Sequence, residues 1–360
     1  MKLKIVDDFQ VKPANIKVIG IGGAGGNAVN LMVSSNIKGI NFITANTDAA
    51  ALNRSLAEYK IQLGPKLTKG QGSGANPDIG RQATEESVDT IEQLLKGTDM
   101  LFITCGMGKG TGTGGSPIVA KISKAMEVLT VGVVTKPFMW EGKLRMAIAE
   151  EGIKELRKYT DVLIEIPNHK ISSIIDENML AAPSFEKSNE VLKKSVQSIS
   201  DIITSQGIIN VDFQDVKAIM KDAGVAMLGF GEASGESRVE QATKMAVSSP
   251  MLEDITISGA KGVLVNITGN SNDLKMEEVN TAMSMIYNEI APDAKHIYGL
   301  VYDNELKNSL RITVIATGFP TDKKQIKSRG VRSGRVSEKE LDITELKKPA
   351  FKRRKKSILK

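Results

Sequence analysis

Short runs of almost entirely apolar residues alternate with segments of helical periodicity through the first half of the chain. The apolar runs have strand length and lie at residues 16–19, 41–45, 100–104, 131–135 and 162–166. Between them, apolar side chains recur at the three- and four-residue spacing of helices, one of which is expected from Asp78 to about Leu95. Strands that are apolar on both faces and alternate with helices indicate a parallel, doubly wound α/β sheet covered on both sides.

The second half of the chain begins with a longer helical pattern. Apolar residues repeat at helical spacing from Pro183 onward, and Gly207 stands where a C-cap glycine is expected. A helix of about 22 residues within 183–207 would be about 33 Å long, enough to bridge two domains. Beyond it, strands are predicted at 225–230, 262–267, 297–302 and 310–316 and helices at 238–248 and 275–290. We therefore expect a second, smaller α/β domain over residues 208–318.

The composition limits the classes of protein to which the chain can belong. With 41% hydrophobic residues the 360-residue chain can bury a large core, and no apolar run reaches the roughly 18 residues of a membrane span. The first residues lack the apolar segment of a secretion signal, and a single cysteine, Cys105, excludes an internal disulfide. Two histidines and one cysteine argue against a structural zinc site. We expect a cytoplasmic protein.

The net charge of +6 is unevenly distributed. Residues 321–360 hold 15 Lys/Arg and 5 Asp/Glu, a net of +10, so the remaining residues carry a net of −4. A protein that binds nucleic acid through its folded part is expected to carry a basic face there. We therefore predict no specific nucleic-acid partner, and a polar linker that is disordered over residues 319–345, followed by a basic tail at 346–360.

A glycine-rich loop, Cys105–Ser116, joins the strand at 100–104 to the next helical pattern and has six glycines between Gly106 and Gly115. Glycines let backbone N–H groups approach an anion, and the start of a helix adds positive partial charge. The hydroxyls of Thr111 and Thr113 add further donors. The loop is not a Walker A loop, because Lys109 lies inside the glycine run rather than after it. The pattern predicts a phosphate-binding loop.

A second glycine loop, Gly20–Asn27, follows the first strand. Its Gly20, Gly22 and Gly25 satisfy G-x-G-x-x-G, and Asp48 after the second strand is placed like a ribose-binding acid, so an NAD-dependent dehydrogenase is an alternative. The loop at 105–116 and the lack of a plausible hydride-transfer site count against it. Because the carboxyl ends of parallel strands share one edge of the sheet, we expect both loops to form one nucleotide pocket.

The run Gly106–Gly114 resembles the signature of the tubulin superfamily, in the form carried by the FtsZ family of bacterial division GTPases. The resemblance covers about residues 15–318. It implies an N-terminal extension at 1–14, a GTP-binding domain at 15–182, a central helix at 183–207 and a second domain at 208–318 that carries a catalytic loop. It also implies that the chain binds GTP or GDP with Mg²⁺, polymerises head to tail with itself, and hydrolyses GTP on assembly at the mid-cell division ring. The alternative is a nucleotide-binding filament protein with little turnover.

The resemblance assigns nucleotide-binding roles residue by residue. Glu141 and Arg145 are matched to contacts with the ribose and phosphates, Phe185 to a ring that stacks on guanine, and Asn189 to a position where many members read the guanine edge with Asp. No metal-ligating side chain is assigned. The full set of predicted nucleotide-binding residues is Gly22, Gly23, Ala24, Gly25, Gly26, Asn27, Asn46, Asp48, Gly106, Met107, Gly108, Gly110, Thr111, Gly112, Thr113, Glu141, Arg145, Asn168, Phe185 and Asn189.

The segment Asn210–Val216 follows the long helix and holds the candidate catalytic residues. By residue types alone it is equally an ordinary turn in which Asp215 caps the next helix. It is similar to a family loop of the form Asn-x-Asp-Phe-x-Asp-Val, which enters the nucleotide pocket of the next subunit and orients the attacking water. The resemblance therefore assigns catalytic roles to Asn210, Asp212 and Asp215.

Several features depart from the family pattern. Ser73 and Ala75 alter the Gly70–Pro77 loop, and Asn189 replaces the common Asp. Lys109 stands where the family has glycine, so it either crowds the phosphate loop or adds a cation beside the phosphates. In the tail, Pro349–Arg353 is similar to the family peptide that binds membrane-tethering adaptors, including the actin-like one, but basic residues precede it. We expect such division adaptors as partners, and contact with a membrane only indirectly or through the basic tail.

Overall fold

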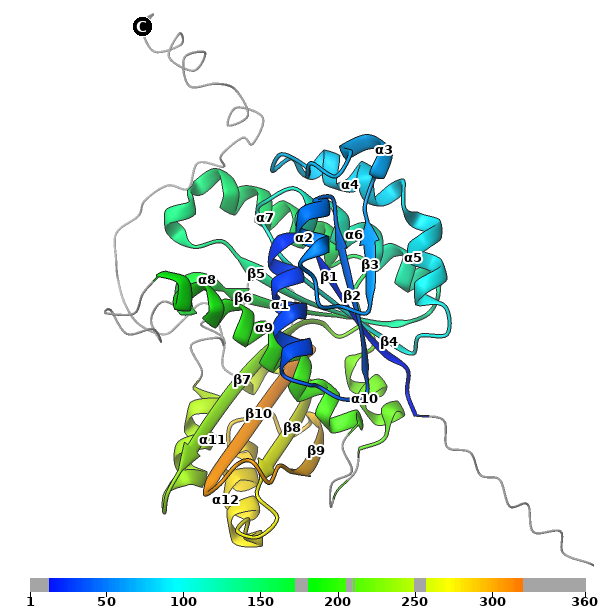
Figure 1. Ribbon diagram of the computed structural model, residues 1–360. Coiled ribbons are helices and arrows are strands. Elements are labelled where there is room, and N and C mark those ends of the chain that lie inside the picture. Colours follow the sequence, from blue (N-terminus) through cyan, green and yellow to red (C-terminus); the bar gives the residue numbers. More distant parts are fainter. Residues whose placement is uncertain (1–12, 172–180, 205–208, 210, 249–256, 320–360) are drawn as a thin grey trace, which may run out of the picture.

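The computed structural model describes residues 13–171, 181–204, 209, 211–248 and 257–319 (Figure 1). The side chains of residues 181–185 are not described. The predicted disordered linker and basic tail, residues 320–360, lie outside the described part, as do residues 1–12 of the predicted N-terminal extension.

The first half of the chain forms the predicted parallel sheet, with strand order β3-β2-β1-β4-β5-β6. Its strands are β1 (Ile16–Ile21), β2 (Ile40–Asn46), β3 (Tyr59–Gln62), β4 (Met100–Gly106), β5 (Leu129–Lys136) and β6 (Val162–Pro167). Helices cover both faces and give two cores. One core packs α1 (Gly22–Ser34) and α9 (Ala181–Thr204) on the sheet, and the other packs α4 (Pro77–Glu85), α5 (Val88–Leu95), α6 (Thr111–Ala125) and α7 (Lys143–Leu156). The doubly wound prediction is confirmed.

The single helix expected from Asp78 to about Leu95 is wrong. The structure has two helices there, α4 and α5, which are separated at Glu86 and Ser87. The Ser87 hydroxyl accepts a hydrogen bond from the backbone N–H of Gly64 at 3.2 Å. This contact with a residue far away in sequence fixes the chain at the break. The first of the two helices begins at Pro77 with Asn76 as its N-cap, whose side chain accepts from the N–H of Asp78 at 2.9 Å.

The second half of the chain continues the same sheet. After α10 (Phe213–Met220), strand β7 (Gly224–Ser234) pairs in parallel with β6 at residues 224–226 and antiparallel with β10 (Ser309–Thr317) along the rest of its length. Strands β8 (Gly262–Gly269) and β9 (Lys295–Tyr302) complete the order β7-β10-β8-β9, and α11 (Arg238–Val247) and α12 (Met276–Tyr287) cover one face. All the predicted strands and helices of this half are therefore present.

Short helices occupy several loops. They are α2 (Ala49–Asn53), α3 (Pro65–Thr68), α8 (Asn168–Ile171) and the 3₁₀ turns Met139–Glu141 and Ile257–Gly259.

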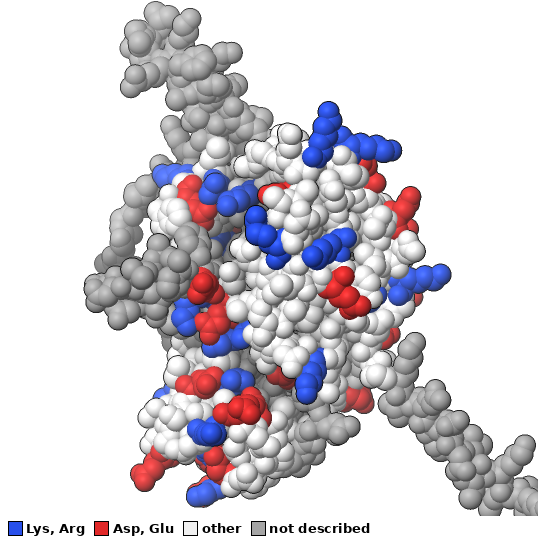
Figure 2. Space-filling view, viewed as in Figure 1, with Lys and Arg blue, Asp and Glu red and all other residues white. Residues whose placement is uncertain are grey.

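None of the described helices is long and apolar enough to cross a membrane. On the face shown in Figure 2, basic and acidic side chains are interspersed rather than gathered into a field of one sign.

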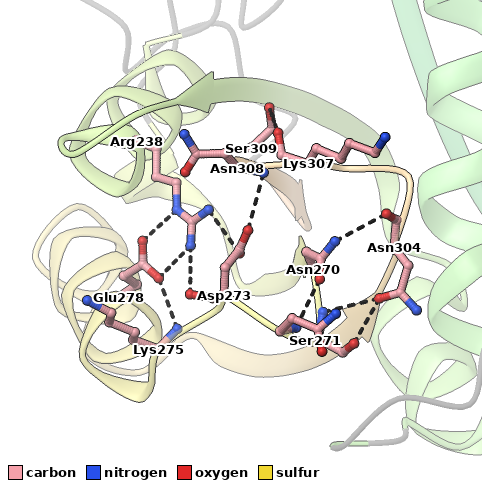
Figure 3. Close-up of polar contacts among 11 residues, drawn as sticks. Arg238, Asn270, Ser271, Asp273, Lys275, Glu278, Asn304, Lys307, Asn308 and Ser309 are labelled. Atoms are coloured by element: carbon pink, nitrogen blue, oxygen red, sulfur yellow. Dashed lines mark hydrogen bonds and ion pairs between the residues drawn. The ribbon is translucent and has the colours of Figure 1, made fainter.

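Polar contacts of a buried arginine, Arg238, join three segments of the second half of the chain (Figure 3). The Arg238 guanidinium donates to the two carboxylate oxygens of Glu278 at 2.7 and 2.9 Å and to the carbonyl of Asp273 at 3.0 Å. Its hydrogen bond to Glu278 holds the pKa of that carboxyl below its usual value. The Asp273 carboxylate in turn accepts from the N–H of Asn308 at 3.2 Å. The network therefore joins α11, the start of α12 and the β9–β10 turn.

Candidate functional site

A cavity of about 740 Å³ lies at the carboxyl edge of the parallel sheet. Its wall is made by the loops that follow β1, β2, β3, β4, β5 and β6, together with Ser188 and Asn189 of α9. This volume is in the usual range for a ligand pocket. The predicted residues that line it are Gly22, Gly23, Ala24, Gly26, Asn27, Asn46, Asp48, Gly106, Met107, Gly110, Thr111, Gly112, Glu141, Asn168 and Asn189.

The wall holds the starts of two helices. Helix α1 begins at Gly22 and α6 begins at Thr111, so both present free backbone N–H groups and positive dipole ends to the cavity. Gly22 has a φ of +72°, and a side chain added there would meet the backbone N of Gly112 at 3.1 Å. The two glycine loops thus touch each other, and together they form an anion-binding surface.

Four predicted residues support the wall without lining it. Gly25 packs so tightly that an added Cβ would lie 2.4 Å from the carbonyl of Thr104. Gly108 donates its N–H to the hydroxyl of Thr113 at 2.9 Å, which folds the phosphate loop onto the first turn of α6. Arg145 forms an ion pair with Glu141 at 2.5 Å. The side chain of Phe185 and all of Asn210 lie outside the described residues.

Three buried hydroxyl groups connect the loops around the cavity by hydrogen bonds. Thr111 Oγ1 lies 2.7 Å from Thr47 Oγ1 and 3.0 Å from Ser73 Oγ, and both contacts are hydrogen bonds. The N–H of Gly72 also donates to the carbonyl of Thr47 at 3.1 Å. Ser73, a departure from the family pattern, therefore links the loop after β3 to the start of α6.

The cysteine of the phosphate loop has a structural role. Cys105 is fully buried at the end of β4, and this burial raises the pKa of its thiol to about 12. The thiol therefore stays protonated and is unsuited to nucleophilic chemistry at neutral pH.

The cations around the cavity differ in their partners. Lys136 is paired with Glu165 at 2.7 Å and Glu150 at 3.2 Å, and Arg145 is paired with Glu141. Lys109 and Arg54 line the cavity and are exposed, and neither forms an ion pair with a carboxylate of the described residues. The positive charge that remains available to a ligand therefore comes from these two side chains.

Several wall residues were not predicted from the sequence. Among them are Asn30, Thr44, Arg54 and Ser188. Asn30 lies two turns inside α1, where its Oδ1 accepts from the N–H of Leu56 at 2.8 Å. No motif marks these positions, because they meet the cavity only through the packing of α1, α2, β2 and α9.

The candidate catalytic acids lie away from this cavity. Asp212 is the N-cap of α10 and accepts from the N–H of Asp215 at 2.8 Å, so the alternative in which Asp215 is the cap is wrong. Both carboxylates are exposed, and neither lines the cavity. In Figure 1, α10 lies at the lower end of the first half, well separated from α2, α3 and α4 at its upper end.

Comparisons with known proteins agree with this architecture. A model of the GTPase domain of the tubulin/FtsZ family matches residues 15–176, and a model of the C-terminal domain of the FtsZ family matches residues 224–320. The cell division protein FtsZ of Buchnera aphidicola is 51% identical over 308 residues, which are 86% of this chain and 80% of that protein. The FtsZ of Coxiella burnetii is 49% identical over 306 residues, 85% and 79% of the two chains.

Solved structures show the same fold. An empty FtsZ dimer from M. jannaschii superposes with a TM-score of 0.84 at 41% identity, over 90% of this chain and 96% of that one. A GTPγS-bound protofilament of CetZ2 from Haloferax volcanii superposes with a TM-score of 0.71, over 86% of this chain and 95% of that one. At 19% identity, the second comparison shows the fold alone.

Proposed function

Because the chain belongs to the tubulin/FtsZ family of cell-division GTPases, we propose that it polymerises head to tail and hydrolyses GTP where two subunits meet. One observation carries this proposal. The cavity and the exposed acids Asp212 and Asp215 lie at different ends of the same chain. A contact that joins these two ends repeats without closing and produces an open filament.

In the proposed complex, the phosphates of GTP lie against the two glycine loops and the starts of α1 and α6. The guanine lies toward Asn27, Phe185 and Asn189. The acids of the neighbouring subunit, with its Asn210, orient a water that attacks the terminal phosphorus. The bond to the oxygen that bridges the β- and γ-phosphates breaks, and GDP and phosphate are released. Hydrolysis of this kind depends on positioning and charge compensation, so it stays slow until the second subunit arrives.

The wall is compatible with a Mg²⁺ ion held chiefly by phosphate and water, which is the usual coordination of this ion beside a nucleotide. Both carboxylate oxygens of Glu141 are engaged, one by Arg145 and one by the N–H of Phe138. Asp48 uses Oδ1 to accept from the N–H groups of Ala50 and Ala51, and its second oxygen, which has no hydrogen bond to a described residue, is available to a ligand. We propose that Asp48 would hold the ion, which would supply positive charge to neutralise the phosphates.

The test is the GTPase rate measured against protein concentration, with sedimentation of the polymer followed in parallel. We expect the rate per molecule to rise steeply from near zero above a threshold, and the pelleted fraction to rise at the same concentration. A constant rate per molecule down to dilute monomer contradicts hydrolysis in trans. Pelleting without turnover would favour the alternative, a filament protein that hydrolyses little.

We propose that residues 346–360 tether the filament to the mid-cell ring through division adaptors. The segment carries eight Lys/Arg around Phe351, Ile358 and Leu359, so a few apolar anchors accompany a strong positive charge. Deleting it is expected to leave GTPase activity and filament formation unchanged while abolishing adaptor binding, lateral bundling of filaments, or both. Pull-down with adaptors and light scattering measure these two properties. Unchanged adaptor binding, bundling and cellular position would mean that the tail serves only to keep the protein in solution.

A further inference from the structure

Lys109 is the residue of the phosphate loop at which the chain departs from its family, and the backbone around it excludes crowding as its main effect. Lys109 is not among the described non-glycine residues with positive φ. The tight contacts belong to its neighbours. A Cβ at Gly108, whose φ is +95°, would lie 2.8 Å from the carbonyl of Arg145, and one at Gly110 would lie 2.2 Å from Ser73 Oγ. A side chain is therefore accommodated at position 109 and at neither adjacent position.

The packing of these neighbours also determines where Lys109 lies. Gly108 is held against Pro137 and Arg145, and Gly110 against Ser73 and Asn76, so the loop is supported on both sides of Lys109. Lys109 itself is exposed and lines the cavity. It precedes Thr111, the first residue of α6, by two positions, which places it at the end of the cavity where backbone N–H groups gather.

The ion pairs around the cavity leave the Lys109 ammonium group available to bind a negatively charged ligand. Lys136, which lines the cavity, is paired with Glu165 and Glu150, and Arg145, whose carbonyl lies beside Gly108, is paired with Glu141. Arg54, the other cavity-lining cation without a carboxylate partner among the described residues, follows α2 rather than the phosphate loop. A nucleotide triphosphate carries several negative charges, and charge-assisted hydrogen bonds are the strong ones.

We propose that Lys109 is a phosphate-binding residue, whose ammonium group contacts the phosphate chain of the bound nucleotide and favours GTP over GDP. The inference rests on the proposed placement of GTP phosphates against the two glycine loops. It adds to that placement a cation that the family pattern lacks at this position. The preference for GTP follows because the triphosphate has one more charged phosphate for the ammonium to neutralise.

The test is the affinity of monomeric protein for GTP and for GDP, measured by calorimetry below the assembly threshold. Lys109→Met is expected to weaken GTP binding about 10- to 100-fold, which is the range for loss of a hydrogen bond to a charged group. We expect a smaller loss for GDP. Lys109→Arg keeps the charge and should retain most of the affinity. Lys121→Met is the matched control, because Lys121 is exposed on α6 and does not line the cavity.

Three results would overturn the proposal. Affinity of Lys109→Met for GTP within about twofold of the parent would mean that the ammonium points into solvent. Equal losses in Lys109→Met and Lys109→Arg would mean that loop geometry, not charge, is responsible. If the parent protein does not bind GTP, that result contradicts the proposed function and therefore also this inference. In contrast, normal binding by the parent together with hydrolysis that is independent of concentration would contradict only the trans mechanism.

Discussion

Replacing Asp212 by alanine is expected to lower the GTPase rate of the assembled protein about 10²- to 10⁴-fold, the range for a group that orients or deprotonates a reacting water. The affinity of the monomer for GTP should stay almost unchanged, because Asp212 does not line the cavity of its own chain. Calorimetry on dilute monomer and phosphate release from pelleted polymer measure the two quantities. Loss of GTP binding by the monomer would show that Asp212 serves its own pocket.

Asp212 is also the N-cap of α10, so alanine removes a helix cap worth about 1 kcal/mol as well as a carboxylate. Asp212→Asn separates these two effects. Asparagine keeps an oxygen that accepts the N–H of Asp215 but carries no charge. We expect the asparagine variant to assemble and to be as inactive as the alanine variant. Turnover at the parental rate in Asp212→Asn would restrict the role of this residue to capping.

The parallel sheet and the location of its pocket were predictable because both depend on local patterns. Apolar strands, helical periodicity and glycine at the strand ends are visible in the sequence, and the carboxyl ends of parallel strands necessarily share an edge. The break between α4 and α5 was not predictable. It depends on a hydrogen bond between Ser87 and Gly64, residues whose approach is fixed only by the packed fold.

The same distinction applies within the site. The glycine loops can be identified from composition. The roles of Thr47 and Ser73 depend instead on hydrogen bonds to Thr111, which is 64 and 38 positions away in the sequence. Residue types alone pointed to Asp215 as the cap of α10, although Asp212 and Asp215 are both good N-caps. The structure decides for Asp212. The nucleotide contacts carried over from the family remain predictions until a bound nucleotide is observed.

A carboxylate outside the nucleotide site is expected to make stability depend on pH. Asp201 of α9 lines a second cavity, of about 200 Å³, between this helix and the sheet of the second half of the chain. Burial raises the pKa of Asp201 from 3.8 to about 6; Asp303 adds to the rise, and Arg311 opposes it. The other charged side chains that line this cavity are Lys193 and Lys194 of the same helix.

The direction of the effect follows from the protons bound in each state. Below pH 3.8 Asp201 is protonated in both the folded and unfolded chain, and its contribution to the free energy of unfolding is at its maximum. As pH rises, the unfolded chain loses this proton first, so the contribution declines and is lost once the pH passes about 6. At about 1.4 kcal/mol per pKa unit, the loss between these limits is about 3 kcal/mol.

Asp201→Asn is therefore expected to raise the free energy of unfolding at pH 7.5 by up to about 3 kcal/mol relative to the parent, since asparagine never acquires the charge. The gain should shrink as the pH is lowered from about 6 to about 4. Urea unfolding of both proteins across this range measures the difference. Asp293→Asn, at an exposed loop position outside the cavity, is the control for loss of a carboxylate. A difference between parent and Asp201→Asn that stays constant with pH would mean that Asp201 is hydrated and charged throughout, and that the cavity between α9 and the sheet is open to water.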